Sequence, residues 1–467
     1  MKQLSILFCC CFLQMSLFAQ NITLQLEKAV QKFEADSQMK HAIVGISIVN
    51  AATNEMVFEK NAQIGLAPAS CQKIITSVSA FEMLGANYKF KTSWGYNGNI
   101  NAGVLNGDLF LTGYGDPSLG SWRYLSTNEN IVLQNWMQLL KNKGIQKVTG
   151  SVYFDNRQFT YQPLPGGWIW NDIGNYYGAG TWALNWHENQ YNLLMAPGSQ
   201  VGDSVKIIGT EPQLLNNHFV NNLKTAKSGS GDNAYIYLAP YANNGFVEGT
   251  VPAGVEKFNI AGALPHPTNQ LQQVLEHAFA SNGIIIDNGF KELNKLNNTD
   301  TKPFALIGNS YSVSLDSINY WFLKKSINLY GESICKSIAY EKKGLGDTED
   351  GVALIKAFWN ERGIESSALN IQDGSGLSPQ NRITANALTK VLLYAQKQSW
   401  FDYFYDALPV YNLMKLKSGT IGGSKSFAGY HQSKEGTKYV VSIIVNNYSG
   451  SASAIVNKMF TVLDILK

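Results

Sequence analysis

Two residues near the N-terminus could form a nucleophile and its base. Ser70 and Lys73 stand three residues apart at the start of an apolar stretch that predicts a helix running to about Leu84. Positions i and i+3 share a helix face, so the Lys73 amine can reach the Ser70 hydroxyl. A lysine can take the proton of a serine if its pKa falls from about 10.4 towards 7. Taken alone, however, this spacing is common, and a capped helix with a surface lysine would explain it better.

Ser326 and Asn328 form a second polar motif, between two segments with helical periodicity, Leu315–Lys324 and Leu329–Tyr340. The hydroxyl could relay a proton, and the amide could hydrogen-bond both the lysine and the backbone of a substrate. In isolation, a polar link that ends one helix and begins the next would be the simpler explanation.

The third motif, Lys417-Ser418-Gly419-Thr420, lies on a strand predicted from Leu413 to Thr420. An edge strand with a glycine lets a peptide lie alongside it and pair backbone to backbone. Lys417 would supply a second cation, and Ser418 a hydroxyl for a terminal carboxylate. An ordinary strand that leads into a turn has a similar sequence, so this motif too is weak when it stands alone.

In this order, the three motifs are the set used by penicillin-binding proteins and serine β-lactamases. The chain resembles in particular the class C low-molecular-mass penicillin-binding proteins, the D-alanyl-D-alanine carboxypeptidase/endopeptidase family. The resemblance covers essentially the whole chain after its first twenty residues. Besides the three motifs, it rests on the segments Ala67–Thr76, Leu84-Gly85, Gly115–Pro117, Tyr176–Ala179, Ala183–Asn185, Asp373–Ser378 and Phe427–Tyr430.

The resemblance assigns a role to each residue of the first two motifs and to Lys417. Ser70 would attack the carbonyl carbon of the penultimate D-alanine of a peptidoglycan stem peptide, with Lys73 as the base. Ser326 and Lys417 would pass the proton to the leaving amine, and Asn328 would position the substrate. The product is an acyl-enzyme that water hydrolyses.

The same resemblance implies that the C-terminal motif binds the reacting carbonyl and the substrate. The backbone N–H groups of Ser70 and Thr420 would form the oxyanion hole beside Gly419, and Ser418 would hold the substrate carboxylate. No metal and no cofactor are expected, and β-lactams are expected to inhibit. Asp373 could shape the floor of the cleft, but Asp-Gly-Ser-Gly is also plain turn chemistry, so no direct catalytic role is predicted for it.

Two positions depart from the family pattern. Ser418 stands where a threonine is common, and Ile327 where an aspartate is common. The first change keeps the hydroxyl, and the second side chain is expected to point away from the site. The long insertion that places Ser326 256 positions after Ser70 is the family's hallmark and argues against a compact β-lactamase.

The elements that must carry these motifs predict an α+β fold of the penicillin-recognising serine transferase and β-lactamase type. A helix over Leu24–Ser37 and strands over Ile43–Asn50 and Glu55–Glu59 precede the first motif. Strands over Ser426–His431 and Lys438–Asn446 and a helix over Ser453–Lys467 follow the third. The two ends therefore predict one catalytic domain, residues 21–93 and 303–467, an antiparallel sheet flanked by helices and split in sequence.

The region between them, residues 94–302, has a different composition. It is rich in Gly, Asn, Tyr and Trp, with strand-like runs at Gly107–Leu111, Lys147–Phe154 and Ala234–Leu238. We interpret it as an inserted, mostly β region. A polar stretch near 201–259 predicts a further domain nested within it.

Residues 1–20 predict a secretory signal. Lys2 precedes an apolar run from Leu4 to Phe18, which ends at Ala19-Gln20 and is too short for a stable membrane span. Its removal leaves Cys71 and Cys335 as the cysteines, too few for a disulfide framework. The chain is therefore expected to act outside the cytoplasm, in a bacterial periplasm, and peripheral attachment to the membrane stays open.

The overall composition is that of a globular protein without a nucleic-acid footprint. The 467 residues include 55 aromatic side chains, and 37 basic residues balance 34 acidic ones. We therefore expect no nucleic-acid partner.

Three functions remain open from sequence alone. The motif order and length favour a serine DD-peptidase that acts on stem peptides; a β-lactamase would share acylation but deacylate quickly. A non-catalytic wall-binding protein would have no need of four intact catalytic side chains. The choice between carboxypeptidase and endopeptidase action, the diamino acid of the stem peptide and the oligomeric state are not predicted.

Overall fold

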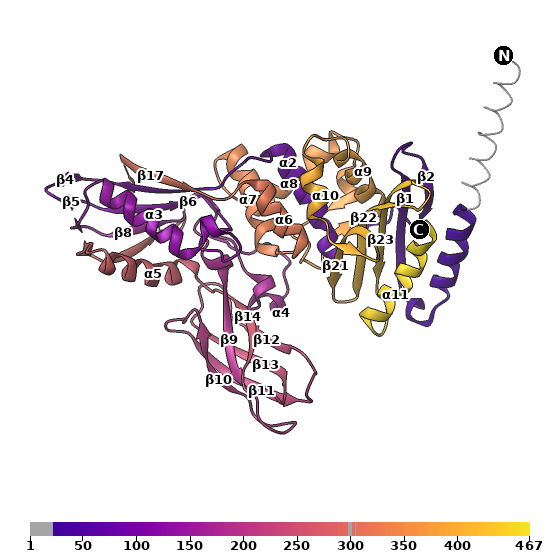
Figure 1. Cartoon of the computed structure of the whole chain (residues 1–467), viewed down its shortest axis with the longest axis horizontal. Coiled ribbons are helices and arrows are strands. Elements are labelled where there is room, and N and C mark those ends of the chain that lie inside the picture. Colours follow the sequence, from indigo (N-terminus) through magenta and orange to yellow (C-terminus); the bar gives the residue numbers. More distant parts are fainter. Residues whose placement is uncertain (1–21, 298–300, 304) are drawn as a thin grey trace, which may run out of the picture. The chain divides into compact units, whose positions relative to one another are not determined.

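The computed structural model describes residues 22–297, 301–303 and 305–467 (Figure 1). Contacts divide the chain into two compact units. The first comprises residues up to 79, 319–326 and 355–467, and the second comprises 80–318 and 327–354. The predicted signal at residues 1–20 lies outside the described residues, and the domain boundaries predicted from sequence stay a prediction.

A six-stranded antiparallel sheet forms the centre of the first unit, in the order β2-β1-β23-β22-β21-β20. β1 and β23 pair over their whole length, so the two ends of the chain share one sheet, and the predicted α+β fold is confirmed. The strands are β1 (Ile43–Asn50), β2 (Met56–Lys60), β20 (Val410–Tyr411), β21 (Met414–Ile421), β22 (Ser424–Gln432) and β23 (Lys438–Asn446).

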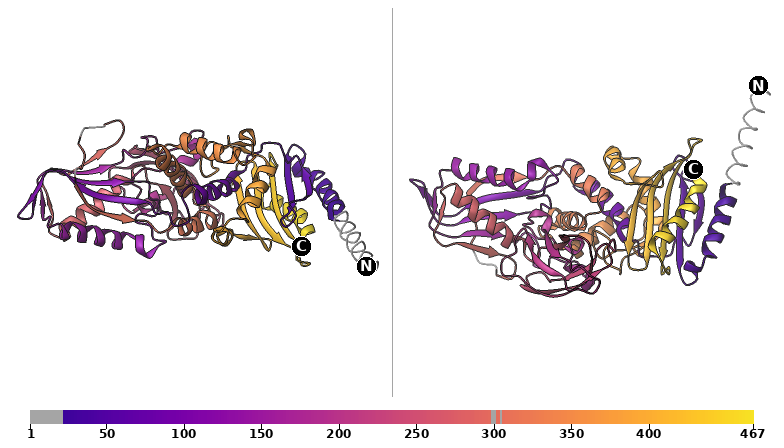
Figure 2. Two further views of the ribbon diagram at one scale, coloured as in Figure 1. Left: turned by 90° about the horizontal axis from the view of Figure 1, so that it is seen from above. Right: turned by 60° about the horizontal axis from the view of Figure 1, so that its bottom comes forward.

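Helices cover both faces of this sheet, which explains why β1 and β23 are buried on both sides. The helix at residues 22–34 and α11 (Ala452–Leu463) share an apolar core with one face (Figure 2). α9 (Ala385–Ala395) lies against β1, β22 and β23, and Thr389 and Ser47 join their hydroxyls at 2.9 Å. The remaining helices and strands wholly in this unit are η1 (Ser37–Met39), η2 (Ala69–Gln72), η6 (Ser366–Ala368), β18 (Leu369–Asn370), β19 (Arg382–Ile383), α10 (Phe401–Ala407) and η7 (Asp464–Leu466).

Three helices contain a boundary between the units. They are α2 (Lys73–Met83), α6 (Leu315–Lys324) and α8 (Thr348–Asn360). α6 has the bounds that its periodicity predicts. α7 (Asn328–Lys343) also occurs where a helix is predicted and belongs to the second unit.

Two sheets and two long helices build the main core of the second unit. A five-stranded sheet has the order β16-β8-β6-β3-β17, and a four-stranded sheet the order β15-β7-β5-β4. Apolar side chains of α3 (Glu129–Asn142) and α5 (Pro267–Ser281) complete this core. The strands are β3 (Lys91–Tyr96), β4 (Asn99–Asn101), β5 (Val104–Asn106), β6 (Leu109–Gly113), β7 (Lys147–Val148), β8 (Val152–Asp155), β15 (Ile285–Ile286), β16 (Phe290–Leu293) and β17 (Ala305–Tyr311).

A second core lies between two three-stranded sheets, in the orders β10-β9-β14 and β11-β13-β12. The strands are β9 (Gln190–Ala196), β10 (Lys206–Glu211), β11 (His218–Ala226), β12 (Asn233–Tyr237), β13 (Asn244–Pro252) and β14 (Phe258–Ala263). The short helices of the second unit are η3 (Leu125–Thr127), α4 (Trp170–Ile173), η4 (Tyr176–Gly178) and η5 (His187–Asn189).

Two local predictions for the inserted region need correction. The run Lys147–Phe154 is not one strand, because β7 and β8 join different sheets. A bend at Gly150 separates them, where an added Cβ would lie 2.4 Å from the carbonyl oxygen of Gly107. The region also contains α3 and α5, which the sequence analysis did not predict.

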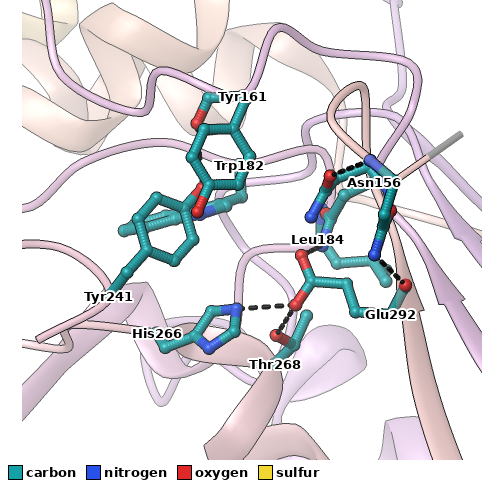
Figure 3. A network of polar contacts seen from close by, with 10 residues as sticks. Asn156, Tyr161, Trp182, Leu184, Tyr241, His266, Thr268 and Glu292 are labelled. Atoms are coloured by element: carbon teal, nitrogen blue, oxygen red, sulfur yellow. Dashed lines mark hydrogen bonds and ion pairs between the residues drawn. The ribbon is translucent and has the colours of Figure 1, made fainter. Parts of the chain in front are cut away.

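A half-buried contact between His266 and Glu292 ties the start of α5 to β16 (Figure 3). His266 Nε2 lies 2.7 Å from Glu292 Oε2, and the Thr268 hydroxyl donates to the same oxygen at 3.2 Å. Asn156 donates from Nδ2 to the other carboxylate oxygen at 3.1 Å and accepts the N–H of Leu184. Three separate stretches of the second unit therefore meet at this carboxylate, and a fourth, at Leu184, joins them through Asn156.

Among the described residues, no helix is both long enough and apolar enough to cross a bilayer.

Candidate active site

Ser70 lies on a 3₁₀ turn rather than on the first turn of an α-helix, and Lys73 follows that turn as the first residue of α2. η2 precedes α2, so the predicted helix begins with this tighter turn. In a 3₁₀ turn, side chains at i and i+3 eclipse one another. Lys73 Nζ accordingly donates to Ser70 Oγ at 2.9 Å. The predicted nucleophile and its predicted base are therefore in direct contact.

The Lys73 side chain is fully buried. Its Nζ also donates to the carbonyl oxygen of Ser375 at 2.6 Å and lies 5.9 Å from the centre of the Phe322 ring. These contacts fix the amine at one point beside the serine, which is the geometry that proton transfer requires.

Asp373 builds the loop that supplies this carbonyl. Its buried carboxylate accepts the backbone N–H groups of Gly376 and Ser378, each at 2.7 Å, and the Nδ2 of Asn381 at 3.0 Å. Gln72 donates from Nε2 to the same carboxylate at 2.9 Å. The Asp-Gly-Ser-Gly sequence predicts a turn here. It carries no signal that the turn presents a carbonyl to the base.

β21 lies against the serine through Gly419. A Cβ added there would lie 2.4 Å from the Pro68 carbonyl oxygen and 2.9 Å from the Ser70 backbone nitrogen. The Ser426 hydroxyl of β22 donates to the same Pro68 carbonyl at 2.5 Å. Only a glycine permits this approach, which brings the strand beside the predicted oxyanion donor of Ser70.

Lys417 is buried beneath the same strand, with 1% of its surface exposed. Burial, with a smaller contribution from the nearby Lys425, lowers the pKa of Lys417 to about 8 against the opposing effect of Cys71. Its Nζ donates to the Ser418 carbonyl oxygen at 2.7 Å, and the Cys71 thiol donates to the Lys417 carbonyl oxygen at 3.1 Å. A lysine in this state can give up its proton near neutral pH.

The outer edge of β21 is open over most of its length. β20 pairs only with Met414 and Lys415, so in the described sheet no strand lies beside residues 416–421 on the side away from β22. The Ser418 hydroxyl donates to the Tyr411 hydroxyl at 3.1 Å, and Thr420 Oγ1 accepts Lys425 Nζ at 2.5 Å. An extended peptide could pair with this edge.

Ser326 and Asn328 lie on either side of the boundary between the units. Ser326 is half-buried between α6 and α7, with a φ of 58° in the left-handed region. Asn328 begins α7, and its Nδ2 donates to the Tyr177 carbonyl oxygen at 2.7 Å. Their membership of one site with Ser70 stays a prediction.

Among the described residues, no group of three or more His, Cys, Asp and Glu side chains could hold a metal ion.

Comparison with known proteins gives one family and one fold. A family model described as the D-Ala-D-Ala carboxypeptidase 3 (S13) family matches residues 26–464. A D-alanyl-D-alanine carboxypeptidase from Actinomadura sp. (strain R39) is 24% identical over 463 residues, which cover 92% of this chain and 82% of that protein. D-alanyl-D-alanine carboxypeptidase DacB from Haemophilus influenzae is 24% identical, with 87% of this chain and 86% of that protein covered. The crystal structure of penicillin binding protein 4 (dacB) from Haemophilus influenzae has a TM-score of 0.79 at 21% identity and covers 94% of this chain and 98% of that one.

Proposed function

The chain belongs to the D-Ala-D-Ala carboxypeptidase 3 (S13) family and is a serine D-Ala-D-Ala carboxypeptidase, and on this premise we propose that it acts on peptidoglycan through an acyl-enzyme on Ser70. The observation that carries the proposal is the contact of Lys73 Nζ with Ser70 Oγ at 2.9 Å, beside the open edge of β21. A nucleophile that touches its base is the signature of covalent catalysis.

In the acylation step, the stem peptide lies along β21 and presents its penultimate D-alanine to Ser70. The Ser70 oxygen forms a bond to the carbonyl carbon as its proton passes to a neutral Lys73. The negative charge that develops on the carbonyl oxygen is met by the backbone N–H groups of Ser70 and Thr420. The close packing of Gly419 on the Ser70 nitrogen supports this placement of the two donors.

In the second half of acylation, the C–N bond breaks and the leaving amine needs a proton. Ser326 and Lys417 relay to it the proton that Lys73 took from Ser70, and the lowered pKa of Lys417, about 8, supports such a transfer near neutral pH. Ser418 holds the carboxylate of the leaving residue, and Asn328 hydrogen-bonds the peptide. A water molecule then hydrolyses the ester and frees Ser70.

We further infer endopeptidase action, export and inhibition by β-lactams. An endopeptidase uses the same centre, since the scissile bond of a cross-link also follows a D-alanine. The signal-like sequence of residues 1–20 supports export to the periplasm. Penicillin binding protein 4 of Haemophilus influenzae has been solved in complex with a β-lactam, which supports the same binding here.

The test is the digestion of defined peptidoglycan fragments by the purified protein. A pentapeptide that ends in D-Ala-D-Ala reports carboxypeptidase action, and a cross-linked dimer reports endopeptidase action, both by mass spectrometry. Ser70→Ala should abolish both, while Ser228→Ala, an exposed serine of the second unit, should change neither. Activity that survives Ser70→Ala would refute the nucleophile. Rapid benzylpenicillin hydrolysis without peptide cleavage would make the protein a β-lactamase, and wall binding without cleavage would make it a binding protein.

A further inference from the structure

The segment from Pro163 to Thr181 forms a long loop whose two ends meet. The Thr181 N–H donates to the Pro163 carbonyl oxygen at 2.9 Å. The chain therefore enters and leaves the loop at one place, as in an Ω-loop, and we call the residues around Pro163 and Thr181 the neck. The loop carries α4 and η4. It also carries Tyr177, whose carbonyl oxygen accepts the amide of Asn328.

The part of the loop that carries Tyr177 is anchored on the neighbouring sheets. The Asn175 side chain accepts the Ile236 N–H of β12 at 3.1 Å, and the Gly174 carbonyl oxygen accepts the Ala263 N–H of β14 at 3.0 Å. These bonds hold the chain on the N-terminal side of Tyr177, and on its C-terminal side the chain runs to the neck at Thr181.

Tyr241 holds the neck from one side (Figure 3). The indole N–H of Trp182 donates to the Tyr241 hydroxyl at 2.8 Å, and that hydroxyl donates to the Tyr161 carbonyl oxygen at 2.8 Å. The rings of Tyr161 and Tyr241 stack at 4.5 Å between centroids. One residue from each side of the neck is thus tied to the same hydroxyl.

Lys336 holds the neck from within. Its Nζ donates to the Gln162 carbonyl oxygen at 2.6 Å and to the Thr181 carbonyl oxygen at 3.4 Å. Ser333, one helical turn earlier on α7, joins its hydroxyl to that of Thr181 at 2.8 Å. Lys336 and Asn328 lie on the same helix, eight residues or about 12 Å apart. α7 therefore hydrogen-bonds the loop at two places, at the neck through Lys336 and Ser333 and at Tyr177 through Asn328.

The Lys336 side chain is fully buried, which is costly for a cation. Burial lowers the pKa of Lys336 to about 8, against the opposing charges of Asp347, Glu332 and Cys335. Because burial is unfavourable for this cation, we look for its role in its contacts with the Gln162 and Thr181 carbonyl oxygens.

We propose that Lys336 is a positioning residue, whose ammonium closes the neck of the 163–181 loop and thereby keeps the Tyr177 carbonyl on the Asn328 amide. This inference rests on the proposed role of Asn328 in substrate binding. It predicts that Lys336 affects acylation through Asn328 alone, and leaves the contact between Ser70 and Lys73 untouched.

The test is a double-mutant cycle on the full-length mature protein, with kcat/KM for a D-Ala-D-Ala pentapeptide and the acylation rate by benzylpenicillin as readouts. Lys336→Met should lower both by on the order of 10²-fold, as expected when a reacting group is displaced by about 1 Å. Lys336→Arg keeps the cation and should restore most of the loss. Lys458→Met, which removes a partly exposed lysine paired with Asp36 in the first unit, is the control and should leave both rates unchanged.

The decisive comparison is made in the Asn328→Ala background. There, Lys336→Met should have almost no further effect, because the residue through which it acts is gone. Losses that multiply would overturn the inference, and so would an unchanged rate in Lys336→Met. If neither the pentapeptide nor benzylpenicillin acylates the wild-type protein, the proposed function itself is refuted. The two failures are therefore distinguishable.

If Lys336→Met does not fold, the wild-type protein still supplies a test. Amide exchange of residues 163–181, corrected for its intrinsic pH dependence, should accelerate as pH rises past about 8 and Lys336 loses its proton. The exchange of β1 and β23 should not follow. Uniform exchange of the loop across this range would contradict the proposal.

Discussion

At the scale of single residues, the candidate site contains two buried lysines with different surroundings. Lys73 contacts the Ser70 hydroxyl and a backbone carbonyl, which suits a group that receives a proton. Lys417 belongs to β21, and its buried amine contacts the carbonyl oxygen of the next residue, Ser418. This placement suits a group that returns the proton to the leaving amine. The two tasks can be separated because only one of the lysines touches Ser70.

Lys417 predicts an alkaline limit to activity. Because its pKa is lowered to about 8, the protonated form is present below that pH and is lost as pH rises through it. The acylation rate should therefore fall above about pH 8. Lys417→Arg should lower the acylation rate at every pH and remove the limb near pH 8, because a guanidinium keeps its proton and cannot pass it on. Stopped-flow acylation by benzylpenicillin from pH 6 to 10 measures both, and an unshifted limb would exclude Lys417 as its source.

The buried carboxylate of Asp373 makes a second prediction at this scale. Asp373→Asn places an amide N–H₂ against backbone N–H donors, and each donor left unpaired costs about 1–3 kcal/mol. The Ser375 carbonyl should then leave Lys73, and acylation should slow by at least tenfold, a conservative figure for a displaced catalytic group. Urea unfolding and acylation rates measure the two effects. Full activity would show that Lys73 does not need this carbonyl.

At the scale of elements, the packing of β21 on η2 depends on one missing side chain. Gly419→Ala would place a methyl group 2.4 Å from the Pro68 carbonyl oxygen, too close for any backbone to tolerate unmoved. We expect a loss of about 1–3 kcal/mol in stability from overpacking. We expect the acylation rate to fall by on the order of 10²–10³-fold, as it does when an oxyanion-hole donor is lost.

The matched control is Gly422→Ala. It lies just beyond β21, and an added Cβ would have nothing within 4 Å. Both stability and acylation should therefore stay within about 0.5 kcal/mol of wild type, the usual range for surface substitutions. If the two variants lose the same activity, the close approach of Gly419 to Ser70 is not what matters.

The sequence predicts elements well where their residue pattern is self-contained. β1, β23 and α6 have the predicted bounds, because a nearly continuous apolar run or a helical periodicity determines them locally. α3 was missed although its signals are present: Asn128 caps its N-terminus and Val132, Trp136 and Leu140 recur at four-residue intervals. The surrounding Gly-rich and Asn-rich strands drew the interpretation towards β structure.

The sequence predicts which residue types the candidate site contains, but it predicts their arrangement in space only in part. The spacing of Ser70 and Lys73 gives the same face in a 3₁₀ turn and in an α-helix, so the tighter turn could not be inferred. The contact of Gln72 with Asp373 joins residues 301 positions apart, a distance over which a single sequence carries no pairing signal. Whether Ser326 and Asn328 complete the site depends on tertiary structure in the same way.

At the scale of the whole molecule, the second unit has a pH-dependent tie between separate stretches of chain. Burial alone would raise the pKa of Glu292, but hydrogen bonds and charge from His266, with help from Asn156 and Thr268, hold it below its ordinary value. A depressed carboxyl pKa contributes stability above the unfolded value of about 4.3, and that stability is lost as pH falls through the folded pKa.

Glu292→Gln should therefore flatten the acid limb of stability. Between pH 5 and pH 3, the melting temperature of the wild-type protein should fall more steeply than that of the variant. Glu276→Gln, an exposed glutamate on α5, should behave as wild type. Identical slopes for wild type and Glu292→Gln would show that this carboxylate has the same pKa folded and unfolded.

The central claim is that Ser70 forms a covalent acyl-enzyme, and peptide mapping after benzylpenicillin treatment tests it most directly. The intact protein should gain the mass of one penicilloyl group, and tandem mass spectrometry should place that group on Ser70. The adduct should persist for minutes and be absent from Ser70→Ala. An adduct on any other residue, or no adduct in a folded protein that binds the drug, would contradict the account.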